Sequence, residues 1–150
     1  MPEEVATPDL VELVRRSTEP FNNRDYDAMM RFWRPDGTWD LSPLGLGVYE
    51  GRAAVRGFFE DWIGAYDDFE IGLEEIRDVG NGVAFVVLAQ TARPAGSVGS
   101  LQLRYASVAI WRDGLIEHCT QYSDIDEARA AAEQLAKERR ENSDLFRPSR

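Results

Sequence analysis

The sequence predicts an α+β fold: a curved, cone-shaped β-sheet of antiparallel or mixed pairing, with three helices of the N-terminal half on its concave face and a C-terminal helix. Residues 9–66 contain three segments with apolar residues at helical spacing. Residues 69–123 have the alternating pattern of strands, separated by segments typical of hairpin turns, and residues from about 124 to 141 again have a helical pattern. A chain of 150 residues is long enough for one core. We expect a single domain over residues 1–150, with a core at about 8–128 and a C-terminal helix and tail at about 124–150.

The first helix begins at Thr7-Pro8-Asp9, because proline is favoured in the first turn of a helix. Leu10, Leu13 and Val14 follow at helical spacing. Pro20 is predicted to interrupt or kink this helix.

The next segment contains a short helix and a short strand. We predict a break at residues 22–25, a helix over 26–33, a turn at 34–37 and a strand over 38–42. Residues 43–47, with the sequence PLGLG, are expected to form a loop.

The clearest helix covers residues 51–66, with Val55, Phe58, Phe59 and Trp62 on one face. Four strands are predicted after it, and residues 79–82 and 112–114 are typical of hairpin turns. The strands are expected at about 69–79, 82–93, 101–112 and 115–123, with a Gly/Ser loop at 93–100. The closing helix, from about 124 to 141, is capped by Asp124 or Asp126, and the last ten residues are expected to fray.

Composition and charge exclude several kinds of function. The net charge is −10, and residues 58–76 carry seven acidic side chains and no basic one, which disfavours nucleic acid and anionic membranes as partners. One cysteine and one histidine cannot form a cysteine-rich or histidine-rich metal site. We expect no metal and no organic cofactor. The acidic N-terminus is not typical of a signal peptide, so a cytoplasmic location is expected.

Three stretches resemble the nuclear-transport-factor-2-like superfamily, and its SnoaL-like branch most closely. They are FNNRDYDAMMRFWRPDGTWD, YEGRAAVRGFFEDW and WRDGLIEHCTQYSD, and the resemblance covers about residues 8–128. It implies a cone-shaped fold with an enclosed apolar pocket for a small hydrophobic molecule. The fold hosts isomerases, cyclases, hydrolases, dehydratases and non-catalytic modules, so it does not by itself define a reaction.

The catalytic residues of two similar groups are not present at the matching positions. Ketosteroid isomerases would have their base at Ser42, an oxyanion tyrosine at Ser17 and an oxyanion aspartate near Ala106. Enzymes similar to limonene-epoxide hydrolase would have their Asp–Arg–Asp set at Gln121, Gln90 and Ala92. Serine is a poor base and residues 101–111 contain no carboxylate, so the isomerase mechanism is not expected. An amide does not accept a proton at neutral pH, so the hydrolase mechanism is not expected either.

Asp40 is the candidate catalytic base. Strand alternation places Asp40, Thr38 and Ser42 on one face and Trp39 on the other. A carboxylate that points into an apolar cavity has a raised pKa and can transfer protons. The alternative is a solvated or turn-capping aspartate.

Seven other residues are candidates for ligand binding. Tyr49 could donate its phenol to a substrate or could pack, while its neighbour Glu50 fits a charge at a helix N-terminus better than a pocket group. Gln90 and Gln121 could hold a carbonyl or hydroxyl ligand or could pair with each other. Trp39, Trp62 and Tyr105 belong to an aromatic-rich interior that forms either core or pocket wall; its members are Trp33, Trp39, Phe58, Phe59, Trp62, Phe85 and Tyr105.

The neighbours His118 and Cys119 cannot form a nucleophile–base pair on a regular strand, because adjacent side chains point to opposite faces. Cys119 shares parity with Glu117 and Gln121 and is expected in the pocket wall. His118, Thr120 and Tyr122 are expected on the convex face. In the superfamily that this chain resembles, this face often packs against a second subunit, so a homodimer is expected.

Two functions follow as hypotheses. The chain is either a cofactor-independent isomerase, cyclase or dehydratase that uses Asp40 as its base, or a non-catalytic module that binds a small hydrophobic molecule or assembles with protein. Neither hypothesis involves nucleic acid or a membrane.

Overall fold

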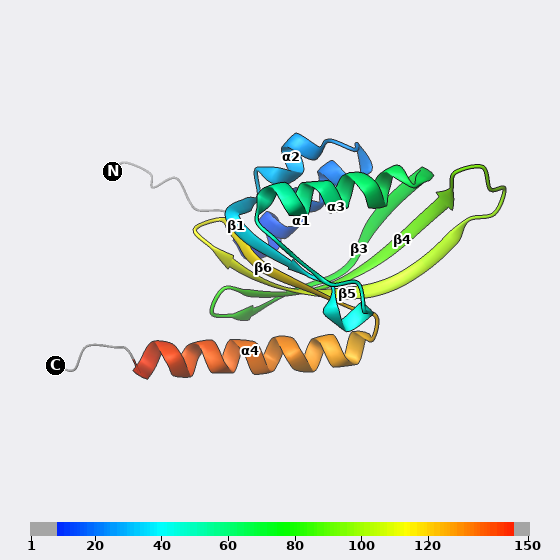
Figure 1. The fold of residues 1–150 in the computed structure, drawn as a ribbon. Coiled ribbons are helices and arrows are strands. Elements are labelled where there is room, and N and C mark those ends of the chain that lie inside the picture. The colour runs from blue at the N-terminus through cyan, green and yellow to red at the C-terminus, as the bar shows by residue number, and fades with distance from the viewer. Residues whose placement is uncertain (1–8, 146–150) are drawn as a thin grey trace, which may run out of the picture.

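The computed structural model of the protein describes residues 9–145. Its elements confirm the α+β class and follow one another in the order that the sequence predicts (Figure 1). They are α1 (Leu10–Asn22), α2 (Tyr26–Met30), β1 (Trp33–Asp40), the 3-10 helix η1 (Ser42–Leu44), β2 (Val48–Glu50), α3 (Arg52–Gly64), β3 (Tyr66–Gly80), β4 (Val83–Pro94), β5 (Leu101–Arg112), β6 (Leu115–Tyr122) and α4 (Ile125–Leu145).

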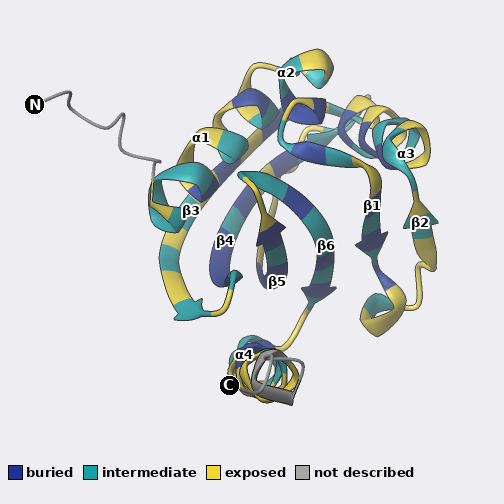
Figure 2. Ribbon diagram, turned by 90° about the vertical axis from the view of Figure 1, so that its left-hand side faces the viewer, coloured by how far each residue is buried: buried dark blue, intermediate teal, exposed yellow. Residues whose placement is uncertain are grey.

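The strands form one mixed sheet in the order β2-β1-β6-β5-β4-β3. Only the β1–β6 pair in this order is parallel, and the other neighbours are antiparallel. The sheet is strongly curved, with α1, α2 and α3 inside the curve and α4 on the outside (Figure 2). The three N-terminal helices therefore cover the concave face of the sheet.

Two hydrophobic clusters lie on the two faces of the sheet. The larger one fills the concave side and includes Phe59 and Ile63 of α3. The smaller one joins the convex face to α4, where Ala128 and Ala132 are fully buried. Small side chains at four-residue spacing let this helix lie close to the strands.

The start and end of α1 are held by side chains. The carboxylate of Asp9 accepts a 2.8 Å hydrogen bond from the Glu12 backbone N–H, as an N-cap does. Pro20 does not end the helix, which continues to Asn22. The amide of Asn22 exchanges two hydrogen bonds, of 3.0 and 2.7 Å, with the backbone of Ile71 in β3. These bonds fix α1 against the sheet edge.

The turn predicted at residues 34–37 is wrong, because these residues belong to β1. The register with β6 shifts between Trp33 and Thr38, so the strand bulges there. A Cβ added at Gly37 would lie 2.9 Å from the Trp33 ring. Glycine and proline here allow a close approach inside a strand, although the same residue types usually indicate a turn.

The remaining elements differ from the predictions mainly at their ends. The strand over residues 101–112 has the predicted bounds. The 3-10 helix η1 begins at Ser42, the last residue of the strand predicted over 38–42, and continues into the predicted loop, while no element was predicted for β2. The Asp124 carboxylate accepts a 3.0 Å bond from the Glu127 N–H and so caps α4. This helix extends to Leu145, further than predicted; residues 1–8 and 146–150, with the Thr7-Pro8 part of the helix start, lie outside the described residues.

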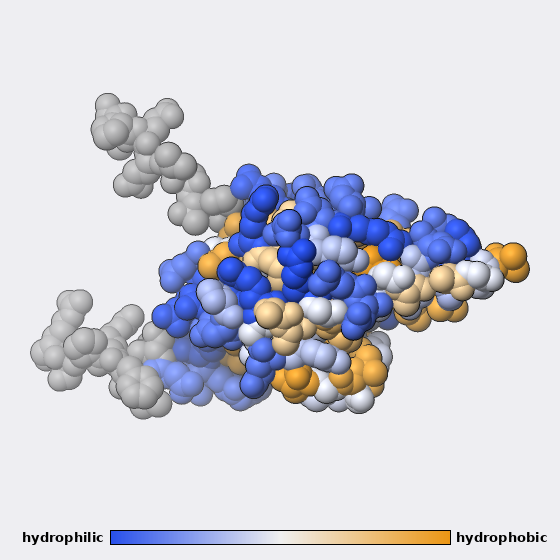
Figure 3. All heavy atoms as spheres, turned by 45° about the horizontal axis from the view of Figure 1, so that its top comes forward, coloured by the Kyte–Doolittle hydropathy of each residue, from blue (hydrophilic) through white to orange (hydrophobic). Residues whose placement is uncertain are grey.

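The surface is largely polar. Figure 3 shows hydrophilic side chains over most of the helical face and a hydrophobic tip at the end that the β4–β5 hairpin forms. Over the part of the chain with described side chains, five large apolar residues are exposed, namely Leu46, Val48, Val98, Leu101 and Leu103. Among the described residues, no helix has the length and apolar composition needed to span a membrane.

Candidate functional site

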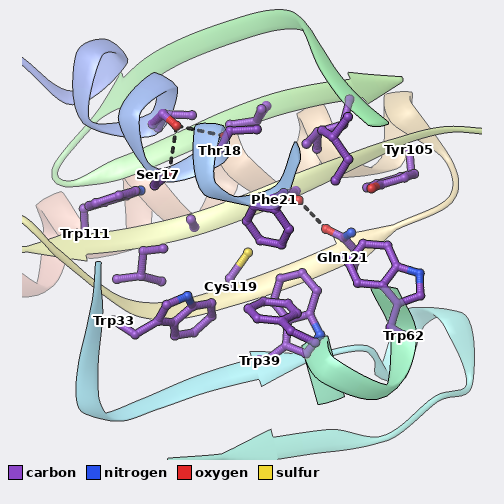
Figure 4. A pocket seen from close by; sticks show the side chains of 18 residues that line it. Ser17, Thr18, Phe21, Trp33, Trp39, Trp62, Tyr105, Trp111, Cys119 and Gln121 are labelled. Atoms are coloured by element: carbon purple, nitrogen blue, oxygen red, sulfur yellow. Dashed lines mark hydrogen bonds between the residues drawn. The ribbon is translucent and has the colours of Figure 1, made fainter. Parts of the chain in front are cut away.

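A cavity lies between the concave face of the sheet, α1 and α3. Its inner chamber has a volume of about 80 Å³, which is room for several waters or for part of a small molecule. The lining comes from α1, β1, α3 and the strands β3 to β6 (Figure 4). Elements distant in the sequence therefore meet at this cavity.

All four tryptophans of the chain line the inner chamber: Trp33, Trp39, Trp62 and Trp111. The rings of Trp33 and Trp39 meet edge to face at 6.0 Å between centroids, and Trp39 packs on Phe59 at 5.2 Å. Such contacts hold large aromatic rings in fixed positions. The chamber therefore has a rigid, mainly apolar wall.

An outer chamber with a volume of about 290 Å³ adjoins the inner chamber. Leucines at residues 41, 44 and 46, around η1, form one side of it. The two chambers share Trp39, Trp62, Tyr105 and Gln121 as wall residues. A molecule that occupies both chambers would pass these four side chains.

Gln90 is a wall residue of the outer chamber and is only 2% exposed. Its Oε1 accepts a 2.9 Å hydrogen bond from the hydroxyl of Tyr105 on the neighbouring strand. Burial raises the pKa of the Tyr105 phenol well above its ordinary value, so the hydroxyl keeps its proton. The pair is neutral at physiological pH.

Gln121 has a similar arrangement on β6. The hydroxyl of Ser107, its register partner on β5, donates a hydrogen bond to the Gln121 Oε1. Both residues line the inner chamber. The two glutamines thus do not pair with each other, as the sequence had left open; each of them binds a hydroxyl from β5.

Cys119 lies in the inner chamber wall. Burial raises the pKa of its thiol to about 12, which outweighs the lowering effect of a hydrogen bond with Ser107. The thiol is therefore protonated at neutral pH and is a weak nucleophile. His118 lies on the opposite face in a groove beside α4, so the two neighbours are separated as strand alternation predicts.

The position of Glu117 differs from the prediction. In the register, Ile110 faces His118 while Trp111 faces Ile116, so Glu117 is an extra residue in β6. Glu117 lines the convex groove, and Ile116 lines the cavity instead. A bulge shifts the alternation by one residue, which the sequence pattern did not reveal.

Asp40 does not lie where the base of a cavity reaction would have to lie, and this corrects our expectation. Its Oδ1 accepts hydrogen bonds from the N–H and the hydroxyl of Ser42, at 2.9 and 2.6 Å, and its Oδ2 is 3.8 Å from Nε2 of His118. Neither chamber has Asp40 in its lining, whereas Trp39 lines both. Alternation along β1 therefore turns the carboxylate to the convex side.

The pKa of Asp40 also argues against a role as base. Burial raises the pKa of its carboxyl, but the hydrogen bonds from Ser42 and the charge of His118 lower it more. The net pKa is below the ordinary value. The turn-capping alternative describes this residue better.

Tyr49 and Glu50 lie outside the cavity wall. Tyr49 packs its ring on Phe58 at 4.8 Å between centroids and lines neither chamber. Glu50 is exposed at the end of β2, next to the start of α3. Tyr49 therefore packs against Phe58, which is itself a wall residue of the outer chamber.

Several cavity residues were missed by the sequence reasoning, and two of them lie on β5. Ser107 and Trp111 share strand parity with Tyr105, and all three line the inner chamber. Parity with Tyr105 was the signal that could have identified them. Ala106, at the position that the isomerase resemblance indicated, lies instead in the convex cluster, and Phe85 does too.

The walls offer little charge for acid–base or metal chemistry. Arg104 is the single permanently charged residue among the described residues that line the two chambers. It is largely exposed and lies 2.7 Å from Glu74. Within residues 9–145, no three His, Cys, Asp or Glu side chains gather to form a metal site.

Residues 14–119 match the sequence model of the SnoaL-like domain family. Comparison with curated protein sequences found no match.

Several solved structures share the fold. TerC, crystallised with polyporic acid, is similar with a TM-score of 0.67 and 17% identity over 83% of this chain and 97% of TerC. A protein with a ketosteroid isomerase-like fold from Catenulispora acidiphila, in complex with trimethylamine, has a TM-score of 0.68 and 14% identity over 85% of this chain and 94% of that one. An LEH-like epoxide hydrolase from M. tuberculosis has a TM-score of 0.64 and 15% identity over 81% and 87%. These identities support a shared fold and no shared reaction.

Proposed function

Because this chain belongs to the SnoaL-like domain family, we propose that it binds a small hydrophobic molecule in its two-chamber cavity. The observation that carries this proposal is the wall itself. It combines all four tryptophans with aliphatic side chains and a few polar groups, which is the usual composition of a small-molecule site.

The same wall favours binding over proton-transfer catalysis. No aspartate, glutamate, histidine or lysine is among the described residues that line either chamber. The two ionisable groups of the inner wall, Tyr105 and Cys119, both have raised pKa values and stay protonated. A general base needs a pKa near the working pH, so we propose a binding module and not an Asp40-dependent isomerase, cyclase or dehydratase.

Tryptophan fluorescence tests the proposal directly, since every tryptophan reports on the inner chamber. Steroid-like, terpenoid and aromatic polyketide compounds would be titrated into the protein, and hits would be checked by thermal shift and for turnover by chromatography. We expect saturable changes in emission and a raised Tm without conversion of the compound. Conversion of a bound compound at a steady rate would contradict the proposal that the protein binds its ligand without catalysis.

A cavity-filling variant supplies the matched control. Ala109 lines the inner chamber, so Ala109→Leu should remove binding by occupying the space. Ala130 is exposed on α4, and Ala130→Leu makes the same chemical change away from the cavity. Equal binding by both variants would show that the compound binds elsewhere.

A homodimer also remains a proposal. Since α4 covers part of the convex face, a second copy would contact the remaining part, where His118, Thr120 and Tyr122 line a groove beside this helix. Light scattering at micromolar concentration should then give twice the chain mass of 17.0 kDa. A value of one chain mass would refute the dimer.

A further inference from the structure

Three buried N–H donors at the cavity wall have no hydrogen-bond partner among the described residues. They are Nε1 of Trp39, Nε1 of Trp111 and Nε2 of Gln90, and the three residues are 6%, 6% and 2% exposed. Figure 4 shows Trp111 at one end of the inner chamber, and Trp39 between Trp33 and Trp62. A buried donor without a partner destabilises the folded protein unless another molecule accepts its hydrogen bond.

The two amide oxygens of the same wall are already in use. The oxygen of Gln90 accepts a hydrogen bond from the Tyr105 hydroxyl, and the oxygen of Gln121 accepts one from the Ser107 hydroxyl. Reversing the amide of Gln90 would free its oxygen as an acceptor and make the phenol a donor without a partner. The two indole N–H groups can only donate, so they remain donors without a partner among the described residues whichever way the amide points.

None of the described residues of the wall is a buried cation that could balance an anionic ligand. Arg104 is the nearest candidate, but it is exposed and paired with Glu74. A carboxylate that entered the inner chamber would lose its hydration without a counter-charge. A neutral acceptor, such as a ketone, quinone or ether oxygen, loses much less.

We propose that the ligand is an uncharged, mainly apolar molecule that carries hydrogen-bond acceptors, with a carbonyl as the best fit. This inference rests on the binding function proposed above and specifies its ligand class. An acceptor near the shared wall of the two chambers meets Trp39 and Gln90, and an acceptor at the inner end meets Trp111. The aromatic and aliphatic wall binds the rest of the molecule.

Three probes of nearly equal size separate the relevant properties. 2-Acetylnaphthalene carries a neutral carbonyl, 2-isopropenylnaphthalene replaces its oxygen with a CH₂ group, and 2-naphthoate carries a charge. Isothermal titration calorimetry at pH 7 should show that the ketone binds about tenfold tighter than the alkene, the effect of one or two net hydrogen bonds. The carboxylate should bind more weakly than the ketone.

Single substitutions then assign the donor. Trp39→Phe and Trp111→Phe each remove one indole donor and keep an apolar ring. Gln90→Met removes the amide donor and also leaves the Tyr105 hydroxyl without its acceptor. In at least one of them the preference for the ketone over the alkene should fall to about twofold or less. The affinity for the alkene is the internal control, because it reports on packing and folding without the hydrogen bond.

The outcomes separate this inference from the binding function on which it rests. Equal affinity of the parent protein for the ketone and the alkene would overturn the ligand class and leave the binding function intact. A ketone preference that survives all three substitutions, or tighter binding of 2-naphthoate than of the ketone, would also overturn it. If none of the three probes bound, the binding function itself would fail.

Discussion

The hydroxyl of Tyr105 donates a hydrogen bond of 2.9 Å to Oε1 of Gln90. This bond joins the neighbouring strands β4 and β5 in the wall of the outer chamber. This bond determines the polarity of the site. It uses the amide oxygen and leaves the amide nitrogen without a partner. A pair that is neutral and fully buried can direct a ligand without transferring a proton to it.

The bond between Tyr105 and Gln90 should contribute to stability. Tyr105→Phe leaves both polar atoms of the Gln90 amide without a partner, which should lower the free energy of unfolding by about 1–3 kcal/mol. Tyr122→Phe removes a phenol from the convex groove and should change it by no more than about 0.5 kcal/mol. Urea unfolding followed by circular dichroism measures both. A similar loss in the two variants would contradict the role of the buried pair.

Cys119 should be unreactive in the folded protein. Burial raises the pKa of its thiol from 9.0 to about 12, so little thiolate forms at pH 8 and the sulfur is covered. Iodoacetamide at pH 8 should modify the native chain far more slowly than the chain in urea, as measured by mass spectrometry. Equally fast modification in both states would show that the cavity wall opens readily.

The same pKa shift gives a pH dependence of stability. Because the folded pKa is the higher one, the unfolded chain loses its thiol proton first as the pH rises above 9. The stabilising contribution is complete below pH 9 and is lost as the pH rises toward 12. Urea unfolding between pH 8 and pH 11 should show this decline, and Cys119→Ala should flatten part of it. An identical slope in the variant would refute the assignment to Cys119.

Asp40→Asn should leave ligand binding unchanged within about twofold, because the side chain caps a turn on the convex side of β1. It should cost about 1 kcal/mol of stability at pH 7, since a charged acceptor for Ser42 is lost. The lowered pKa of Asp40 means that this contribution is present above the ordinary carboxyl pKa and is lost as the pH falls through the folded value. Loss of binding in the variant, measured by tryptophan fluorescence, would return Asp40 to the site.

The contact between α4 and the sheet should be sensitive to side-chain volume. Ala132 is fully buried against the convex face, so Ala132→Leu should overpack this contact and lower stability by about 1–3 kcal/mol. Ala130→Leu on the exposed face of the same helix should have little effect. Thermal unfolding of the two variants separates the outcomes. Equal Tm values would mean that α4 is not held against the sheet.

Much of the fold could be predicted because its signals are local. Alternation in residues 101–112 predicted β5 with its true ends, and the apolar stripe through Phe59 and Trp62 predicted α3. The prediction of a turn at residues 34–37 was wrong because the structure there depends on a tertiary contact and not on a local signal. Gly37 is present because the Trp33 ring approaches it closely, and such a contact is visible only once the strands are paired.

The sequence by itself determined the class of fold and the residues that share each side of a strand, since these depend on composition and on the two-residue period of a strand. The family followed from the resemblance of three stretches. Cys119 was expected in the cavity wall and lies there, whereas the sequence left core and wall open for Trp39, Trp62 and Tyr105 and a pairing open for Gln121; all four line the inner chamber. Only the tertiary structure decided which side of β1 faces the cavity. Periodicity separates two faces without orienting them, and a bulge shifts it by one residue. For this reason Asp40 turns outward. We propose instead that the ligand meets the donors of Trp39, Trp111 and Gln90, which have no partner among the described residues.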